Sequence, residues 1–221
     1  MPHTLSPREG YRLWAPRYSA ETAVSHLDEV AVRALGVATA GRALLDVGCG
    51  TARRLAASGA ALAVGVDLTP EMLERAERSL SLAAADVRAL PLGAETFDVV
   101  WCRLVIGHVR ELGRAYRELA RVCRRDGAIV VTDFHPAAAA AGHRRTFRDE
   151  TGALHVLEHH AHAPASHVAA GRRAGLSLVA RRDAAVGDEV ARFYAHAGRM
   201  DAYERQRGLP LVLALVFRKA R

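Results

Sequence analysis

Short apolar runs alternate with amphipathic stretches along most of the chain. Apolar runs bounded by glycine, proline or acidic residues are typical of buried strands, whereas apolar positions three or four residues apart are typical of helices. The runs expected to form strands lie at 42–47, 61–66, 82–87, 97–101, 128–134, 176–182 and 209–218. The stretches expected to form helices lie at about 20–35, 53–58, 70–79, 110–123 and 165–174. Strands and helices in alternation predict an α/β fold with a mostly parallel sheet.

Residues 1–36 form an N-terminal lead-in before the first strand. Tyr11, Trp14 and Tyr18 are spaced three and four residues apart, which places them on one helix face. Pro16 interrupts that helix, so we expect a short helix, a bend and a second helix. The aromatic side chains either pack against the core or close over a site.

The pattern changes again at 137–167, after the fifth strand. A turn at 149–152 lies between two short extended stretches, which predicts a β-hairpin. The segment is rich in histidine, yet no histidine pair has the rigid spacing of a helical metal site and no acidic cluster joins them. We therefore expect no metal site here.

The turn after the first strand carries the most specific pattern, Asp46-Val47-Gly48-Cys49-Gly50-Thr51. Gly48 and Gly50 allow a tight turn and close approach of a ligand, and the next helix directs its free N–H groups toward that space. A dinucleotide-binding loop would need a third glycine where this chain has Arg53, and a P-loop would need a lysine. An ordinary strand-to-helix turn is the structural alternative.

This stretch resembles motif I of the class I S-adenosylmethionine-dependent methyltransferases, in the small-molecule branch similar to the quinone-biosynthesis enzymes. The resemblance covers nearly all of 1–221 as a single domain and is strongest at 44–134. It implies a seven-stranded, mostly parallel Rossmann-like sandwich with an antiparallel last strand and a lid inserted after strand five. It also implies S-adenosylmethionine as the cofactor, bound over the carboxyl ends of the strands. The family often has a glycine at the position of Ala52, where the methyl group narrows the space for the cofactor.

The cofactor residues follow from the turn, the strand tips and the resemblance. Asp67 ends the second strand, where a carboxylate can accept hydrogen bonds from ribose hydroxyls, and Thr69 is expected to cap the next helix. The resemblance implies that Asp86 accepts from the adenine amino group and that the Val87 N–H meets a ring nitrogen. The residues expected at the cofactor are Tyr18, Asp46, Gly48, Cys49, Gly50, Thr51, Asp67, Leu68, Met72, Asp86, Val87, Cys102, Arg103 and His108.

Methyl transfer to an alcohol or phenol also requires removal of a proton, and histidine titrates in the suitable range. His135, at the tip of the fifth strand, is the expected base, with His160 and His143 in the lid as alternatives. Positioning of donor and acceptor without any base is a further possibility.

Net charge +7 and a pI near 10.0 raise the possibility of a nucleic-acid substrate. The arginines are scattered, however, and no basic stripe contains interleaved aromatic residues. After strand four, Cys102-Arg103-Leu104-Val105 stands where base-modifying enzymes have an Asn/Asp-Pro-Pro-Tyr/Phe motif. A small molecule, for example a natural product, is therefore the expected methyl acceptor. A nucleic-acid methyltransferase and a non-catalytic cofactor-binding protein remain the alternatives.

The chain shows no membrane-span-like run or secretory leader pattern, and its three cysteines lack zinc spacing. We expect a cytoplasmic protein, monomeric or homodimeric, without membrane contact.

Overall fold

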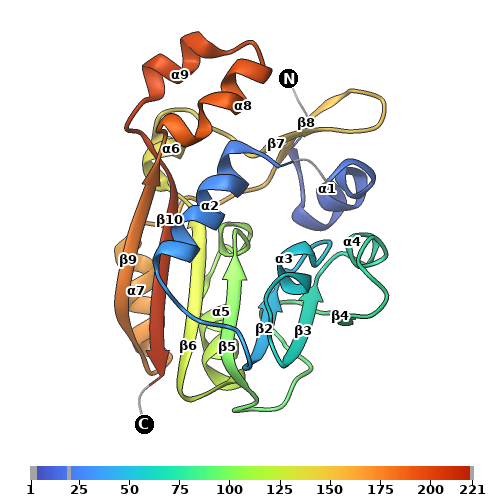
Figure 1. The fold of residues 1–221 in the computed structure, drawn as a ribbon, viewed down its shortest axis with the longest axis vertical. Coiled ribbons are helices and arrows are strands. Elements are labelled where there is room, and N and C mark those ends of the chain that lie inside the picture. Colours follow the sequence, from blue (N-terminus) through green and yellow to red (C-terminus); the bar gives the residue numbers. More distant parts are fainter. Residues whose placement is uncertain (1–3, 19–20, 220–221) are drawn as a thin grey trace.

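The structure is a computed structural model and describes residues 4–18 and 21–219. A seven-stranded sheet has the order β4-β3-β2-β5-β6-β10-β9 (Figure 1). Strand β10 is antiparallel to β6 and β9, and the pairs from β4 to β6 are parallel. The strands are β2 Ala43–Val47, β3 Leu62–Asp67, β4 Ser81–Ala84, β5 Phe97–Arg103, β6 Cys123–Phe134, β9 Leu176–Ala185 and β10 Pro210–Lys219. This sheet confirms the predicted fold class.

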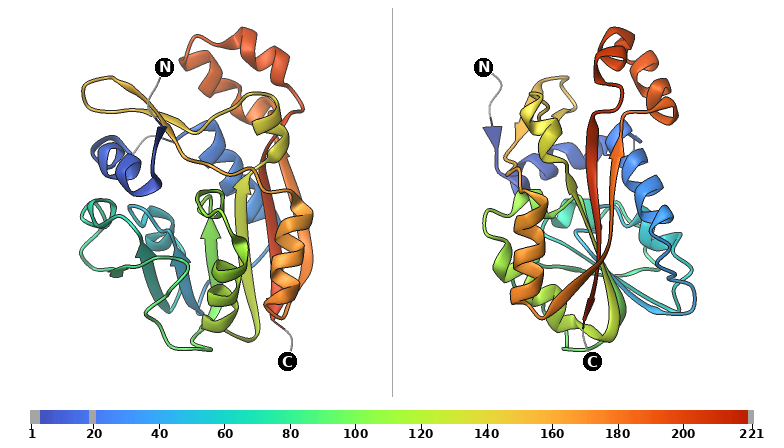
Figure 2. Two further views of the ribbon diagram at one scale, coloured as in Figure 1. Left: turned by 180° about the vertical axis from the view of Figure 1, so that it is seen from behind. Right: turned by 90° about the vertical axis from the view of Figure 1, so that its left-hand side faces the viewer.

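Helices cover both faces of the sheet (Figure 2). Helices α2 (Ala23–Ala34) and α3 (Arg53–Ala56) lie on one face, and α5 (Leu112–Val122) and α7 (Pro164–Arg173) lie on the other. The central strands are therefore buried on both sides, which explains their nearly continuous apolar sequence.

The lead-in and the lid form one unit beside the carboxyl ends of the strands. Strand β1 (Thr4–Leu5) pairs with β8 (Leu154–Leu157), which pairs with β7 (Thr146–Arg148). Helix α1 (Pro7–Trp14) and the 3₁₀ turn η1 (Ala15–Arg17) follow β1. We call β1, α1, η1, β7 and β8 the cap. The hairpin β7–β8 confirms the sequence prediction, but the parallel pairing of β1 with β8 was not predicted.

Several predicted helices are shorter than expected. The helix predicted at 70–79 ends at Leu73 in α4 (Pro70–Leu73), because few later side chains are buried against the fold to support it. Thr69 stands at the N-cap position of α4 as predicted, but its side chain makes no capping hydrogen bond. The helix predicted at 53–58 is reduced to the single turn of α3, in which Leu55 is buried and Ala56 is exposed. The predicted start of the second helix near residue 20 lies outside the described residues.

The remaining short elements lie in the connections. Beyond β9, a segment without a sequence assignment is helical and forms η3, α8 and α9. The strand predicted at 128–134 begins earlier, at Cys123 in the long strand β6, where Asp126 has a positive φ of 59°. The bounds are η2 Ile106–His108, α6 Pro136–Ala140, η3 Asp188–Val190, α8 Ala191–His196 and α9 Met200–Gln206.

Candidate cofactor and acceptor site

The turn between β2 and α3 needs glycine for two reasons. Gly48 and Gly50 have φ values of 74° and 57°, in the left-handed region that suits glycine. A Cβ added to Gly48 would lie 2.1 Å from Cγ2 of Val105. The N–H groups of Gly48 and Cys49 both donate to the carbonyl of Val66, at 2.7 and 3.0 Å, so the turn is fixed to β3.

Ala52 also adopts a left-handed conformation, with a φ of 54°, and its side chain is fully buried. This conformation costs an L-residue about 1–2 kcal/mol, which gives a physical reason for the glycine that the resembling family often has there. The N–H of Ala56 donates to the Ala52 carbonyl at 3.0 Å, so the strained residue begins α3.

Asp67 joins the tip of β3 to the glycine turn. Its Oδ2 accepts from the Gly50 N–H and its Oδ1 accepts from the Thr69 N–H, both at 2.8 Å. Burial raises the pKa of Asp67, although these backbone hydrogen bonds oppose the shift. The carboxylate is thereby held in one orientation at the edge of a cavity that it helps to line.

This cavity has a volume of about 430 Å³ and lies between the strand tips and the cap. Its size falls within the range of small-molecule sites, roughly 300–1,000 Å³. Most residues predicted to contact the cofactor line it. They are Tyr18, Gly48, Cys49, Gly50, Thr51, Asp67, Leu68, Met72, Asp86, Val87, Arg103 and His108.

Two residues predicted at the cofactor, Asp46 and Cys102, are not among those lining the cavity and are buried in the sheet. Burial raises the pKa of Asp46 to about 6, while Arg103 and Arg54 lower it. Burial also raises the pKa of the Cys102 thiol and of the Cys49 thiol, so neither is a ready nucleophile.

Asp86 reaches the cavity but already has a partner. Its carboxylate accepts from Nε of Arg88 at 2.9 Å and from the same guanidinium at 2.5 Å. These hydrogen bonds lower the pKa of Asp86, so it is a charged acceptor.

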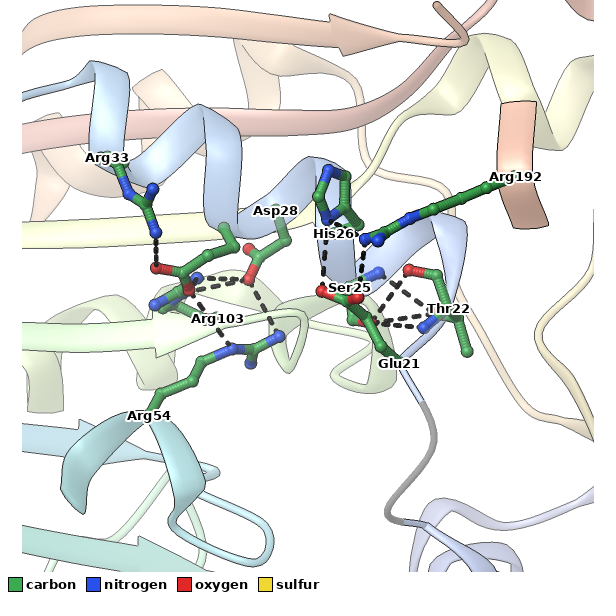
Figure 3. A network of polar contacts seen from close by, with 10 residues as sticks. Glu21, Thr22, Ser25, His26, Asp28, Arg33, Arg54, Arg103 and Arg192 are labelled. Carbon is green, nitrogen blue, oxygen red and sulfur yellow. Dashed lines mark hydrogen bonds and ion pairs between the residues drawn. The ribbon is translucent and has the colours of Figure 1, made fainter. Parts of the chain in front are cut away.

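Arg103 is buried and is held by an acidic pair on α2 (Figure 3). Its guanidinium donates to Asp28 at 2.7 Å and to Glu29 at 2.8 Å. Arg54, from α3, approaches the same Asp28 carboxylate at 3.1 Å. Asp28 is fully buried and therefore ties α2 to β5 and to the helix after the glycine turn.

The same carboxylate supports the backbone beside the cavity. The Thr132 hydroxyl donates to Asp28 at 2.5 Å and accepts from the Leu104 N–H at 2.9 Å. Leu104 lines the cavity and has a φ of 59°, a strained conformation for leucine. The buried carboxylate thus fixes the hydroxyl that holds this strained residue.

Aromatic rings form the cap side of the cavity. Trp14 stacks on Phe147 with ring centroids 5.0 Å apart and meets Tyr18 edge-on, also at 5.0 Å. A Cβ added to Gly50 would lie 3.6 Å from the Tyr18 ring, so Tyr18 covers the glycine turn. Burial raises the pKa of Tyr18 to about 12, so the phenol stays protonated.

His108 connects the cap to η2. Its Nδ1 lies 2.9 Å from the Glu158 carbonyl, which can only accept, so Nδ1 carries the proton. Nε2 is then the acceptor for the Tyr11 hydroxyl at 3.1 Å. Burial and the nearby Arg145 lower the pKa of His108 to about 3, which makes it a neutral bridge and a weak base.

The three candidate bases occupy different places. His160 lines the cavity, and its Nε2 lies 3.5 Å from the Glu158 carboxylate. His135 and His143 are not among the cavity residues. His135 caps α6 by accepting from the Ala137 N–H at 3.1 Å, which turns its Nδ1 to the backbone.

Other lid histidines have structural contacts. Nε2 of His159 and Nε2 of His167 lie 3.5 and 3.4 Å from the buried carboxylate of Asp133. Burial opposes ionisation of that carboxylate, but these two histidines outweigh it and lower the pKa of Asp133 to about 2. His162 donates to the Val109 carbonyl at 2.8 Å. Among the described residues, no group of three metal-ligating side chains is arranged to hold a metal ion.

Several residues of the site carried no sequence signal. Arg145 and Glu158 line the cavity from the lid, and Asp28 acts from α2 on residues of β5 and β6. None belongs to a short motif, because each reaches the site from a segment remote in sequence. Tyr11 was expected on a helix face with Trp14, but its hydrogen bond to His108 was not.

Comparison with known proteins gives the class. Residues 45–131 match the family described as a methyltransferase domain. Over 94 residues the chain is 35% identical to malonyl-[acyl-carrier protein] O-methyltransferase of Pseudescherichia vulneris, covering 40% of this chain and 38% of that protein. Over 115 residues it is 30% identical to 27-O-demethylrifamycin SV methyltransferase of Amycolatopsis mediterranei, covering 47% and 42%. The chain thus spans about two fifths of the length of these curated relatives.

A solved structure shares the fold over most of the chain. It is an S-adenosylmethionine-dependent methyltransferase from Mesorhizobium loti, with a TM-score of 0.67 and 22% identity, covering 87% of this chain and 98% of that one. Together with the sheet order and the glycine turn, these matches confirm the predicted class, a class I S-adenosylmethionine-dependent methyltransferase domain. The cofactor of that class is S-adenosylmethionine. The likeness to the quinone-biosynthesis branch stays a prediction.

Proposed function

We propose that this protein transfers the methyl group of S-adenosylmethionine to an O, N or C nucleophile of a small molecule. The proposal rests on a single cavity that is lined on one side by the strand tips and on the other by the cap. The glycine turn and Asp67 form the first wall, and the cap closes the second with Tyr11 and Trp14. An acceptor held under the cap is thereby brought within reach of a donor held on the strand tips.

The first wall suits the cofactor. In this proposal Asp67 accepts from the ribose hydroxyls with the lone pairs that Gly50 and Thr69 leave free. Asp86, Val87, Leu68 and Met72 line the same cavity and would hold the adenine. Gly48, Arg103 and His108 would hold the methionine end.

The sulfonium supplies the chemical driving force. When the cofactor is bound, the bond between sulfur and the methyl carbon would break as the acceptor atom bonds to that carbon, and the electron pair would stay on sulfur. The residues around the cavity hold the two reactants in line and exclude water, which accounts for much of the acceleration of such reactions.

A hydroxyl acceptor must also lose its proton. We propose His160 for this step, since it is the one of the three predicted bases that lines the cavity. The proton passes to the imidazole, and the Glu158 carboxylate at 3.5 Å stabilises the imidazolium. His135 and His143 become structural residues in this account.

We propose that the protein works in the cytoplasm. Its three cysteines are unpaired thiols, which supports a reducing compartment. Among the described residues, no helix is long and apolar enough to cross a membrane.

Cofactor binding is tested by calorimetry with S-adenosylhomocysteine. We expect the wild-type chain to bind it and Asp67→Asn to bind at least about tenfold more weakly, because the charged acceptor is lost. Asp201→Asn, which changes an exposed carboxylate on α9, is the matched control and should behave as wild type. Absence of binding to the wild-type chain would overturn the proposed function.

Transfer is tested with labelled S-adenosylmethionine against phenols, alcohols, amines, carboxylic acids and tRNA. Label in a small molecule supports the proposal, whereas label only in RNA contradicts it. For a hydroxyl acceptor we expect His160→Gln to lower kcat about 100-fold. His135→Gln and His143→Gln should retain most activity, as should the exposed control His196→Gln. Unchanged turnover in His160→Gln would remove it from the base role.

A further inference from the structure

Arg145 places a guanidinium in the cavity and forms no ion pair with a carboxylate among the residues that the structure describes, while the Asp133 carboxylate acts on it only from beyond ion-pair distance. It is partly buried, and its guanidinium donates to the Tyr11 hydroxyl at 3.2 Å. A guanidinium has five N–H donors in a planar fork, so most of its capacity is left for another group. A partly buried charge of this kind is expected to meet an opposite charge when the site is filled.

The other arginines of the cavity differ from Arg145. Arg54 and Arg103 are paired with Asp28 and Glu29, and Arg88 is paired with Asp86. Arg8, Arg53 and Arg110 line the cavity but are exposed to solvent. Among the arginines that line the cavity in the described part of the chain, Arg145 is therefore the one that is partly buried and forms no ion pair.

The cavity as a whole favours an anion. Seven arginines line it, against the three acidic residues Asp67, Asp86 and Glu158. The chain also carries a net charge of +7, and a positive cleft raises the local concentration of negatively charged ligands.

The position of Arg145 is on the acceptor side. It precedes β7 in the lid, and its carbonyl accepts from the Leu157 N–H at 2.8 Å, which fixes its backbone to the β8 end of the cap. Tyr18 covers the glycine turn, and Tyr11 meets Tyr18 edge-on at 5.9 Å. Arg145 donates to Tyr11, so its guanidinium lies beyond Tyr18 as seen from the glycine turn.

We propose that the methyl acceptor carries a carboxylate and that Arg145 binds it as a bidentate ion pair. Tyr11 positions the guanidinium by accepting a hydrogen bond from one N–H, while its own hydroxyl donates a hydrogen bond to Nε2 of His108. This inference rests on the proposed function and deepens it, because it gives the acceptor's chemical class. The carboxylate is the recognition group, and the nucleophile lies elsewhere on the acceptor or is a carboxylate oxygen itself.

The test uses benzoate and malonate as probes, titrated into the wild-type chain saturated with S-adenosylhomocysteine and followed by NMR. We expect at least one acid to bind, and the neutral analogue of that acid (benzamide or malonamide) to bind at least about tenfold more weakly. Arg145→Gln should weaken acid binding at least about tenfold. Arg144→Gln, an exposed arginine one position earlier, should leave it unchanged. No acid binding to the wild-type complex, equal binding of acid and amide, or an unaffected Arg145→Gln variant would each overturn the inference.

A second arm separates the acceptor from the cofactor, which also has a carboxylate. The probes are S-adenosylhomocysteine and 5′-methylthioadenosine, of which the second lacks that carboxylate. We expect Arg145→Gln to bind both with the affinity of the wild-type chain. If the variant loses affinity only for S-adenosylhomocysteine, Arg145 serves the cofactor and the inference is wrong.

The acid titrations are repeated without any nucleoside. Acid binding that depends on Arg145 in a chain unable to bind S-adenosylhomocysteine would overturn the proposed function while leaving the anion site in place. Failure of the acid arm alone would leave the proposed function intact.

Discussion

The two walls of the cavity are held by different interactions. On the strand side, Asp67 is fixed by two backbone hydrogen bonds and Arg103 by a buried ion pair. On the cap side, ring contacts such as Trp14 against Phe147 predominate, with a short parallel pairing of β1 to β8. Directional, buried contacts hold one geometry, whereas ring stacks and a two-residue strand tolerate displacement. We therefore expect the strand side, the proposed cofactor wall, to stay fixed and the cap to open more readily for exchange of reactants.

His108 lies between the two walls and belongs to both. It follows β5 in the fixed part, yet its two ring nitrogens contact Tyr11 and Glu158 of the cap and lid. Both hydrogen bonds require His108 to be neutral, so we expect the closed position of the cap to depend on the protonation state of this imidazole. Substitutions in either wall, or at His108 between them, are expected to affect stability and binding to different extents.

The largest expected effect is on the fixed wall. Asp28→Ala removes the carboxylate shared by Arg103, Arg54 and Thr132 and leaves a buried guanidinium uncompensated. Breaking a buried pair in this way costs about 3–5 kcal/mol. We expect the free energy of unfolding, measured with urea, to fall by that amount.

Arg33→Gln is the matched control for Asp28→Ala, because it changes an ion pair on the same helix whose arginine is 81% exposed. It should alter the free energy of unfolding by less than about 0.5 kcal/mol. If Asp28→Ala costs no more than this control, the buried network does not hold the fixed wall.

The second effect concerns the bridge and is a dependence on pH. The folded pKa of His108 is about 3, and an unfolded histidine has a pKa of about 6.5. Between these values the unfolded chain binds a proton that the folded chain does not, so acidification removes stability. The slope is at most about 1.4 kcal/mol per pH unit, or about 2 kcal/mol between pH 6.5 and 5. In His108→Gln this contribution should disappear.

The difference between wild type and His108→Gln in the pH dependence of the free energy of unfolding gives the contribution of His108. Asp46 acts in the opposite direction, because its folded pKa of about 6 lets the folded chain bind a proton first, but it is present in both. Urea titrations at pH 5 and 6.5 give the comparison, and the exposed control His196→Gln should keep the wild-type slope. Identical slopes in wild type and His108→Gln would show that the imidazole is not buried by the cap.

The sequence predicted the fixed wall better than the cap for a physical reason. The strands, the glycine turn and Asp67 depend on local requirements: continuous apolar runs, positive φ at Gly48 and an acid at a strand tip. Such requirements leave a trace in neighbouring residues. The sheet order follows once those elements are read as a methyltransferase domain.

The cap depends on contacts between distant segments, which leave no local trace. Two residues at β1 pair with β8, and Tyr11 meets Arg145 across 134 positions. His135 was the expected base because it stands at the tip of the fifth strand, beside the expected position of the methyl group. In the structure the chain turns into α6 at that point, and the imidazole is used to cap the helix. Asp28 was missed because a single acid on an amphipathic helix gives no sign that it is buried.

The smallest effect on the sheet is expected from the cap itself. Trp14→Ala removes the rings' common partner, since Trp14 contacts Tyr11, Tyr18 and Phe147. We expect amides of β7 and β8 to exchange with deuterium at least about tenfold faster, while the free energy of unfolding of the sheet changes by less than about 1 kcal/mol. Affinity for S-adenosylhomocysteine should fall, because Tyr18 no longer stays over Gly50. The control Leu154→Ala changes a 44% exposed side chain of the same hairpin and should leave exchange unaltered. Equal loss of protection in β7 and in the central strand β5 would mean that cap and sheet unfold as one unit, and the distinction between a fixed wall and an opening wall would fail.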